Sequence, residues 1–170
     1  PYGGTDQSTP LDELVAVGNT LFFEAYSATS GNELWKSDGT SNGTVMVKDI
    51  YNGSSSSYPS SLTAVGNTLY FNAYDGSTGF ELWKSDGTSN GTVMVKDINS
   101  GSGNSNAGRF TAIGSTLYFR ANDGTNGTEL WKSDGTASGT VMVKDIRSGS
   151  SSGGPTYFTP IGNTVYFRAN

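Results

Sequence analysis

Two pairs of acidic residues flank short glycine-rich segments and are the first candidates for chemistry. Asp75 and Glu81 form one pair, and Asp123 and Glu129 form the other at the same spacing. Carboxylate and carbonyl oxygens are the ligands that calcium prefers. Each segment therefore predicts a loop that can wrap a calcium ion, although Ser27 stands where an equivalent earlier segment would need its first acid. The alternative is a plain loop closed by Asp and Gly turn chemistry, with no cofactor.

Five aromatic residues are candidates for stacking against sugar rings, because an exposed aromatic face offers a large, rigid contact area. They are Trp35, Trp83, Trp131, Tyr26 and Tyr74. Each tryptophan follows a leucine in a β-prone run, so we favour packing between neighbouring sheets for the tryptophans. The two tyrosines follow a predicted strand and are better placed for exposed contacts, with an ordinary surface role as the alternative.

The composition argues against an enzyme. The chain has no histidine and no cysteine, which excludes Ser-His-Asp and Cys-His catalysis, zinc sites built on those residues, and disulfides. A pair of carboxylates could still hydrolyse a glycoside. However, acid and base roles require two different environments, whereas the acids of this chain recur in near-identical surroundings.

The net charge and the hydropathy of the chain limit the kinds of binding partner that it can have. The formal net charge of -5 argues against nucleic acid, and no apolar stretch is long enough to span a membrane. The arginines fall in the later part of the chain, and their sequence positions indicate no convergent cluster. They are Arg109, Arg120, Arg147 and Arg168.

A repeat of 48 residues organises the chain, as the spacing of the three tryptophans shows. Residues 33–50 and 81–98 are identical, and residues 129–146 differ from them only at Ala137 and Ser138. Three full repeats are present, followed by the opening of a fourth. Such a period must be explained before any local feature, because each repeat is one structural unit.

Each repeat predicts two β-hairpins. In the second repeat, residues 61–65 and 68–74 are β-prone runs around a Gly-Asn turn, and residues 80–85 and 92–98 flank a longer turn. Four antiparallel strands every 40 to 50 residues or so are typical of a β-propeller blade. We therefore predict an all-β, propeller-like array of four-stranded blades, with a β-solenoid as the competing architecture.

The predicted units follow the repeat. We expect an N-terminal segment, three blades and the first hairpin of an incomplete fourth blade, at residues 1–11, 12–59, 60–107, 108–155 and 156–170. Consecutive apolar residues within single strands indicate sheets covered on both faces. The last hairpin would then present an unpaired edge and an uncovered face.

The run Glu-Leu-Trp-Lys-Ser-Asp-Gly-Thr, followed by Gly-Thr, Val and Lys-Asp-Ile, resembles the ELWxxDGT repeat family over residues 12–170. That resemblance implies a propeller in an exported bacterial protein, located outside the cell or at its surface, and it implies no particular activity. The turn is also similar to the Asp-box turn of sialidase-type propellers. Its Ser37-Asp38-Gly39-Thr40 lacks the intervening residues, so no sialidase chemistry is carried over.

Two functions are consistent with these features. The first is a non-catalytic extracellular repeat module with a structural or self-assembly role, whose open blade edge is completed by another copy, in a ring or a filament, or by further repeats. The alternative is a multivalent carbohydrate-binding module, assisted or not by calcium. The expected partners are accordingly the chain itself or carbohydrate.

Overall fold

The computed structural model describes residues 14–170, which form an all-β structure with no helix among them. The first sheet contains β1 (Val15–Val17), β2 (Thr20–Ser27), β3 (Gly31–Ser37) and β4 (Val45–Lys48). The second contains β5 (Ser60–Val65), β6 (Thr68–Tyr74), β7 (Phe80–Ser85) and β8 (Val93–Lys96). The third contains β9 (Gly108–Ile113), β10 (Thr116–Asn122), β11 (Thr128–Ser133) and β12 (Val141–Lys144). A two-stranded hairpin of β13 (Thr156–Ile161) and β14 (Thr164–Arg168) follows.

Each four-stranded sheet is antiparallel, and its strands pair in chain order. The prediction of an all-β repeat of four-stranded antiparallel sheets followed by a single hairpin is confirmed. The expected N-terminal segment, residues 1–11, lies outside the described residues. Within residues 14–170, no helix is long and apolar enough to cross a membrane.

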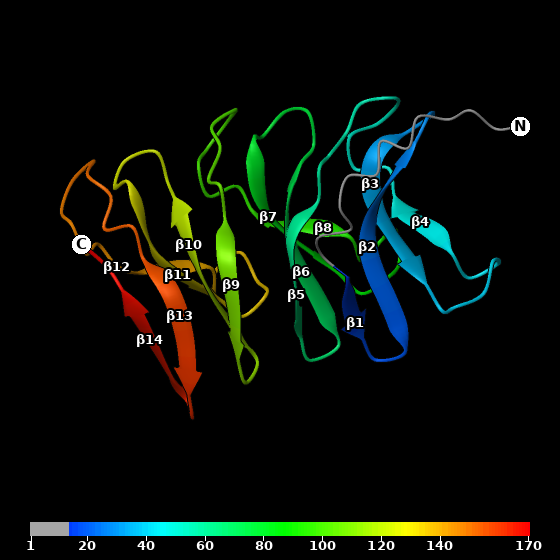
Figure 1. Ribbon diagram of the computed structural model, residues 1–170. Coiled ribbons are helices and arrows are strands. Elements are labelled where there is room, and N and C mark those ends of the chain that lie inside the picture. Colours follow the sequence, from blue (N-terminus) through cyan, green and yellow to red (C-terminus); the bar gives the residue numbers. More distant parts are fainter. Residues whose placement is uncertain (1–13) are drawn as a thin grey trace, which may run out of the picture.

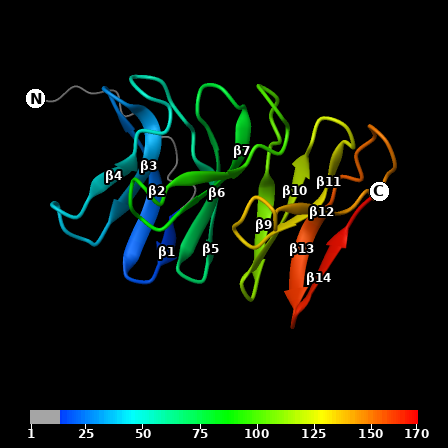
Figure 2. The same ribbon diagram turned by 180° about the vertical axis from the view of Figure 1, so that it is seen from behind.

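The sheets follow one another in chain order, from the blue first sheet to the red hairpin (Figure 1). The view from behind shows the same order, with the first sheet and the hairpin at opposite ends of the row (Figure 2). The first strands of neighbouring sheets touch: β1 contacts β5, β5 contacts β9, and β9 contacts β13. The sheets are thus stacked through their first strands, and the two ends of the row lie apart.

The hairpin turns follow from their residue types. Gly66 has a φ of 59° in the two-residue turn between Val65 and Thr68, which are paired across the hairpin. In the longer turn, Asp86 Oδ1 accepts hydrogen bonds from the Thr88 N–H at 2.8 Å and the Thr88 hydroxyl at 2.7 Å. The Asp86 carboxylate also lies where a side chain on Gly91 would stand. Asp-Gly turn chemistry therefore closes this loop.

Two hydrophobic clusters lie between the sheets. One joins Phe22 and Leu34 of the first sheet to Leu69, Phe71 and Trp83 of the second. The other joins residues of the second sheet to residues of the third, namely Val65, Tyr70 and Leu82 to Leu117, Phe119 and Trp131. The second sheet is consequently buried on both faces, which explains the consecutive apolar residues in its strands.

Lysine side chains connect neighbouring sheets across the same interfaces. Lys36 Nζ donates to the Gly87 carbonyl at 2.7 Å, and Lys48 Nζ donates to the Thr92 carbonyl at 2.8 Å. The equivalent Lys84 and Lys96 donate at 2.8 Å to Gly135 and Thr140 of the third sheet. Each interface thus repeats the same two charge-assisted bonds.

Candidate functional site

The second hairpins of the repeats are nearly identical, whereas several positions on the first hairpins change from one repeat to the next, and two of these positions hold arginine in the later repeats. In the first strand, Ser61, Arg109 and Tyr157 occupy equivalent positions. In the second strand, Asn72, Arg120 and Arg168 do so. A shared fold needs the constant positions, so these variable positions are where each repeat can differ in what it presents.

The variable positions of the first strands lie at β-bulges. In β9 the pairing passes from Gly108 opposite Arg120 to Thr111 opposite Tyr118, so that two residues oppose one on β10. Arg109, the first of those two residues, has a φ of 58°. Ser61 and Tyr157 have φ values of 58° and 57° at the same place in β5 and β13. A bulge of this kind redirects a side chain and is common beside functional sites.

A cavity beside these bulges lies between the second and third sheets and has a volume of about 490 Å³. Its polar lining comes from the two bulges, from the second strands and from the segment before β9. The polar side chains are those of Ser61, Thr63, Asn72, Asn106, Arg109 and Arg120, of which Thr63 is constant from the second repeat onward. Most of this polar lining therefore comes from positions that vary between repeats.

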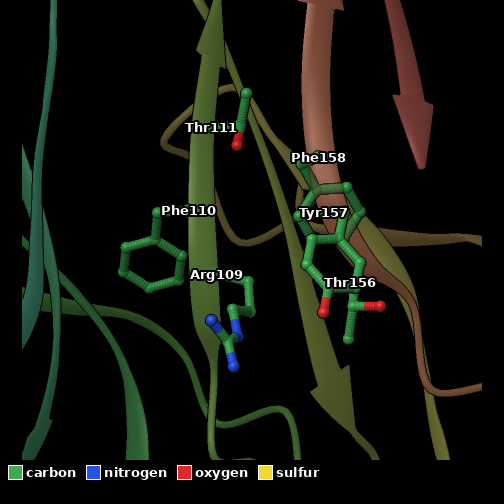
Figure 3. A pocket seen from close by; sticks show the side chains of 6 residues that line it. All are labelled: Arg109, Phe110, Thr111, Thr156, Tyr157 and Phe158. Atoms are coloured by element: carbon green, nitrogen blue, oxygen red, sulfur yellow. The ribbon is translucent and has the colours of Figure 1, made fainter. Parts of the chain in front are cut away.

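A second cavity of about 330 Å³ adjoins the first, because Arg109 lines both. It lies between β9 and β13 and is lined by Arg109 to Thr111 and by Thr156 to Phe158. Figure 3 shows the side chains of Arg109 and Tyr157, from neighbouring strands, directed into the same space. A cation and a phenol are thus presented together at this position.

Asn72 is the buried polar residue of the lining. Its side chain is 8% exposed, and its Oδ1 atom has no hydrogen-bond partner. Buried amide oxygens without a donor are uncommon and carry a free-energy penalty. The cavity therefore contains an acceptor that a bound hydroxyl or amine can satisfy.

The sequence positions indicated no convergent cluster of the four arginines, and the structure brings two of them to one cavity. These two are Arg109 and Arg120, and Arg168 lines a further cavity of about 280 Å³ with Tyr157. Arg109 and Arg120 come together because they lie on the paired strands β9 and β10, where Arg120 is opposite Gly108. The variation between otherwise constant repeats was the signal that could have found them.

The tryptophans lie in or beside the cores and are not brought together. Trp83 and Trp131 are each 6% exposed. Phe71 stacks on Trp83, and Lys48 and Lys96 lie over the rings of Trp83 and Trp131 at 6.0 and 5.8 Å. Trp35 is half-buried on the first sheet. The faces of Trp83 and Trp131 are therefore occupied by protein, which leaves Trp35 as the more accessible tryptophan.

The two tyrosines differ in exposure. Tyr26 is 71% exposed, whereas Tyr74 is half-buried. Tyr74 makes an edge contact with Tyr51, at a centroid distance of 5.3 Å, and stacks on Phe80 at 5.5 Å. Tyr26 thus has the free face that stacking needs, and Tyr74 already has aromatic neighbours.

The acids of the predicted calcium loops each have their own backbone donors. Glu81 is fully buried and accepts hydrogen bonds from the N–H groups of Ile98 at 2.8 Å and Ser105 at 2.9 Å. Asp75 Oδ1 accepts from the N–H groups of Ser77 and Thr78, both at 2.8 Å. Glu81 therefore fixes the segment after β8 to β7, while Asp75 closes its own turn.

The third repeat shows the same division. Glu129 is fully buried and accepts from the Ile146 N–H at 2.9 Å and from the Gly153 N–H. Asp123 Oδ1 accepts from the N–H groups of Thr125 and Asn126. Among the described residues, no three acids gather in one place to hold a metal. A cation at either loop would have to compete with these N–H donors.

Burial and hydrogen bonding act in opposite directions on the pKa values of Glu81 and Asp75. Burial raises the pKa of Glu81 above its ordinary value, although the N–H groups of Ile98, Ser105 and Asn99 oppose it. Burial also acts to raise the pKa of Asp75, but the N–H groups of Thr78 and Ser77 outweigh it and hold that pKa below the ordinary value. The buried glutamates are thus structural acceptors in a dry setting.

The described architecture is similar to one solved structure. The crystal structure of the computationally designed Ika8 protein matches 92% of this chain with a TM-score of 0.50 and 16% sequence identity. The chain spans 42% of the length of that designed protein. At this identity the similarity concerns the fold alone. No protein-family model matches the chain, and no curated protein matches it.

Proposed function

We propose that the chain is part of a non-catalytic, extracellular β-propeller-type repeat protein whose open end is completed by more of the same repeat. The four-stranded sheets packed through their first strands support a propeller-like arrangement. The extracellular and bacterial setting rests on the resemblance of the repeat to the ELWxxDGT family. The remaining argument concerns what covers the last sheet.

The observation that carries this proposal is the repeated lysine contact between sheets. Lys132 and Lys144 of the third sheet are equivalent to Lys84 and Lys96, which donate to the following sheet. Within residues 14–170, Lys132 and Lys144 have no such acceptor. Val143 is 44% exposed on the neighbouring strand β12, and Tyr166 of β14 is 56% exposed. The third sheet thus carries one half of an interface whose other half is a further repeat.

A chain extended by one hairpin tests this proposal. Asn170 is equivalent to Asn122, so a copy of residues 123–155 placed after Asn170 supplies the two strands that β13 and β14 lack to form a four-stranded sheet. Burying two further large apolar side chains raises the free energy of unfolding by about 3 kcal/mol or more. We expect the extended chain to unfold at a higher urea concentration. A control extension with serine in place of the residues equivalent to Trp131, Val141 and Val143 should give no gain.

Completion by a second copy is tested by the mass of the unextended chain in solution. Sedimentation velocity should show a mass that rises with concentration, and the extended chain should associate less. An extension that adds no stability, together with a monodisperse monomer of the original chain, would contradict both forms of completion.

A second function, carbohydrate binding, is favoured by a separate observation. The cavities at the first strands are lined by the residues that vary between repeats, including Asn72, Arg109 and Tyr157. Concave sites with a few convergent polar groups are typical of small-ligand binding. A screen of immobilised glycans with and without calcium tests this function. Binding that requires calcium would support a calcium site at the loops of Asp75 and Asp123.

A further inference from the structure

We propose that the cavity between the second and third sheets binds an acidic saccharide, a sugar that carries a carboxylate or sulfate group beside free hydroxyls. This inference rests on the second proposed function, carbohydrate binding, and names its ligand class. The site lies between two complete sheets, so it does not depend on how the end of the row is completed.

The arginines define the charged half of the ligand. Arg109 and Arg120 both line the cavity, and neither guanidinium group has an ion-pair or hydrogen-bond partner among the described residues. A guanidinium group presents planar, paired donors that match a carboxylate or sulfate. The chain as a whole carries a net charge of -5, whereas the two arginines make this cavity locally positive. An oxyanion is the ligand group that fits this positive charge.

Asn72 indicates the uncharged, hydroxyl-bearing half of the ligand. Its buried Oδ1 has no donor, and an oxyanion cannot supply one. A ligand hydroxyl can donate to this oxygen, so a ligand with both an oxyanion and a hydroxyl satisfies the cavity better than a simple anion does. Ser61 adds a further hydroxyl to the lining. Acidic sugars carry both groups on one ring.

The backbone at Arg109 supports the assignment. A φ of 58° is a conformation that glycine adopts freely and other residues adopt at a cost. The chain uses glycine at most of its other positive-φ positions, but it places serine, arginine and tyrosine at this bulge. A side chain is therefore retained here against the preference of the backbone. Strain of this kind is common where a side chain has a function.

Two matched pairs of ligands test the chemistry by isothermal titration at physiological salt. The first pair is an oligogalacturonate and its neutral methyl ester, and the second is dextran sulfate and dextran. We expect at least one acidic member to bind at least 10-fold more tightly than its neutral counterpart. Sodium sulfate and sodium acetate, titrated alone, should bind at least 10-fold more weakly than that acidic saccharide.

Variants test the location. R109Q and R120Q should each weaken binding of the acidic saccharide at least 10-fold, and N72L should weaken it several-fold. R147Q removes the same charge from an arginine outside the lining of this cavity, so its affinity should match that of the unmodified chain. Unchanged urea midpoints of R109Q and R120Q show that the fold is retained.

The outcomes separate the two proposals. Equal binding of neutral and acidic members overturns the acidic-saccharide assignment and leaves carbohydrate binding in place. Equal binding of inorganic sulfate and the acidic saccharide reduces the site to an anion site and overturns the assignment. An effect of R147Q as large as that of R109Q shows a general charge effect and overturns the location. Binding by none of the saccharides overturns both this assignment and the carbohydrate function.

Discussion

Arg109 combines two properties that rarely coincide, a left-handed backbone and a long charged side chain. Its position at the bulge of β9 fixes the φ of 58°, and its side chain lines two adjoining cavities. If the side chain is retained for binding, replacing Arg109 with glycine should relieve the backbone strain at this position. The residue is therefore a place where stability and function can be measured separately.

We predict that R109G is more stable than R109A by about 1 kcal/mol, because glycine adopts the left-handed region without the steric penalty of a Cβ atom. Both variants remove the arginine side chain, so their difference reports the backbone alone. Urea unfolding followed by tryptophan fluorescence measures it. At Arg147, which has no positive φ, the order should reverse, with alanine the more stable. A glycine variant at residue 109 that is less stable than the alanine variant would contradict the bulge geometry.

The buried glutamates allow a second prediction. Glu81 accepts bonds from the N–H groups of Ile98 and Ser105, and a glutamine there would turn one N–H₂ group toward these donors. We expect E81Q to lower the free energy of unfolding by about 2 kcal/mol or more, since a buried donor would lose its acceptor. D75N should cost much less, because an asparagine Oδ1 still accepts from Ser77 and Thr78. Equal losses in the two variants would be inconsistent with these roles.

The sequence predicted the elements of this fold well because each element is encoded locally. Gly66 and the Asp86 turn specify the two hairpins of a repeat, and the repeated period places four strands in each unit. The bulges were not predicted, because Ser61, Arg109 and Tyr157 are not residue types that indicate a left-handed backbone. The cavities were missed for the related reason that they form between repeats, where no single stretch of sequence records the contact.

The same distinction applies to Glu81 and Glu129. Their spacing from Asp75 and Asp123 suggested a shared cation, yet each glutamate bonds to the segment that follows the fourth strand of its sheet. Ile98 lies 17 residues after Glu81, and a contact of that range is not visible as a local motif. A pattern of acids along a chain records spacing but not the direction of the side chains.

At the scale of the element, the lysine contacts offer a matched comparison between sheets. Lys84 donates to the Gly135 carbonyl at 2.8 Å, whereas the equivalent Lys132 has no acceptor within residues 14–170. We predict that K84A lowers the free energy of unfolding by about 1.5–3 kcal/mol, the range for a hydrogen bond from a charged donor. K132A should change it by less than about 0.5 kcal/mol. Urea unfolding of both variants provides the test, and equal losses would show that the bond between sheets contributes nothing.

At the scale of the whole molecule, burial falls from the middle of the row toward its end. In the second sheet, Leu69, Tyr70 and Phe71 are consecutive and all buried. In the terminal hairpin, the equivalent Tyr166 and Phe167 are 56% and 37% exposed. Stacked repeats gain most of their stability from contacts with their neighbours. The hairpin contacts the third sheet through β9 and has nothing on its other face within the described residues.

We therefore predict a gradient of hydrogen exchange along the row. The amides that pair β6 with β7 should exchange only on global unfolding, whereas those that pair β13 with β14 should exchange by local opening, at least about 100-fold faster. Mass spectrometry of peptides from 60–85 and 156–170 measures both in one experiment. Raising the protein concentration should slow exchange in 156–170 selectively if another copy covers the hairpin. Slow exchange of β14 at low concentration, matching that of β6, would contradict the assignment of the hairpin as an uncovered end.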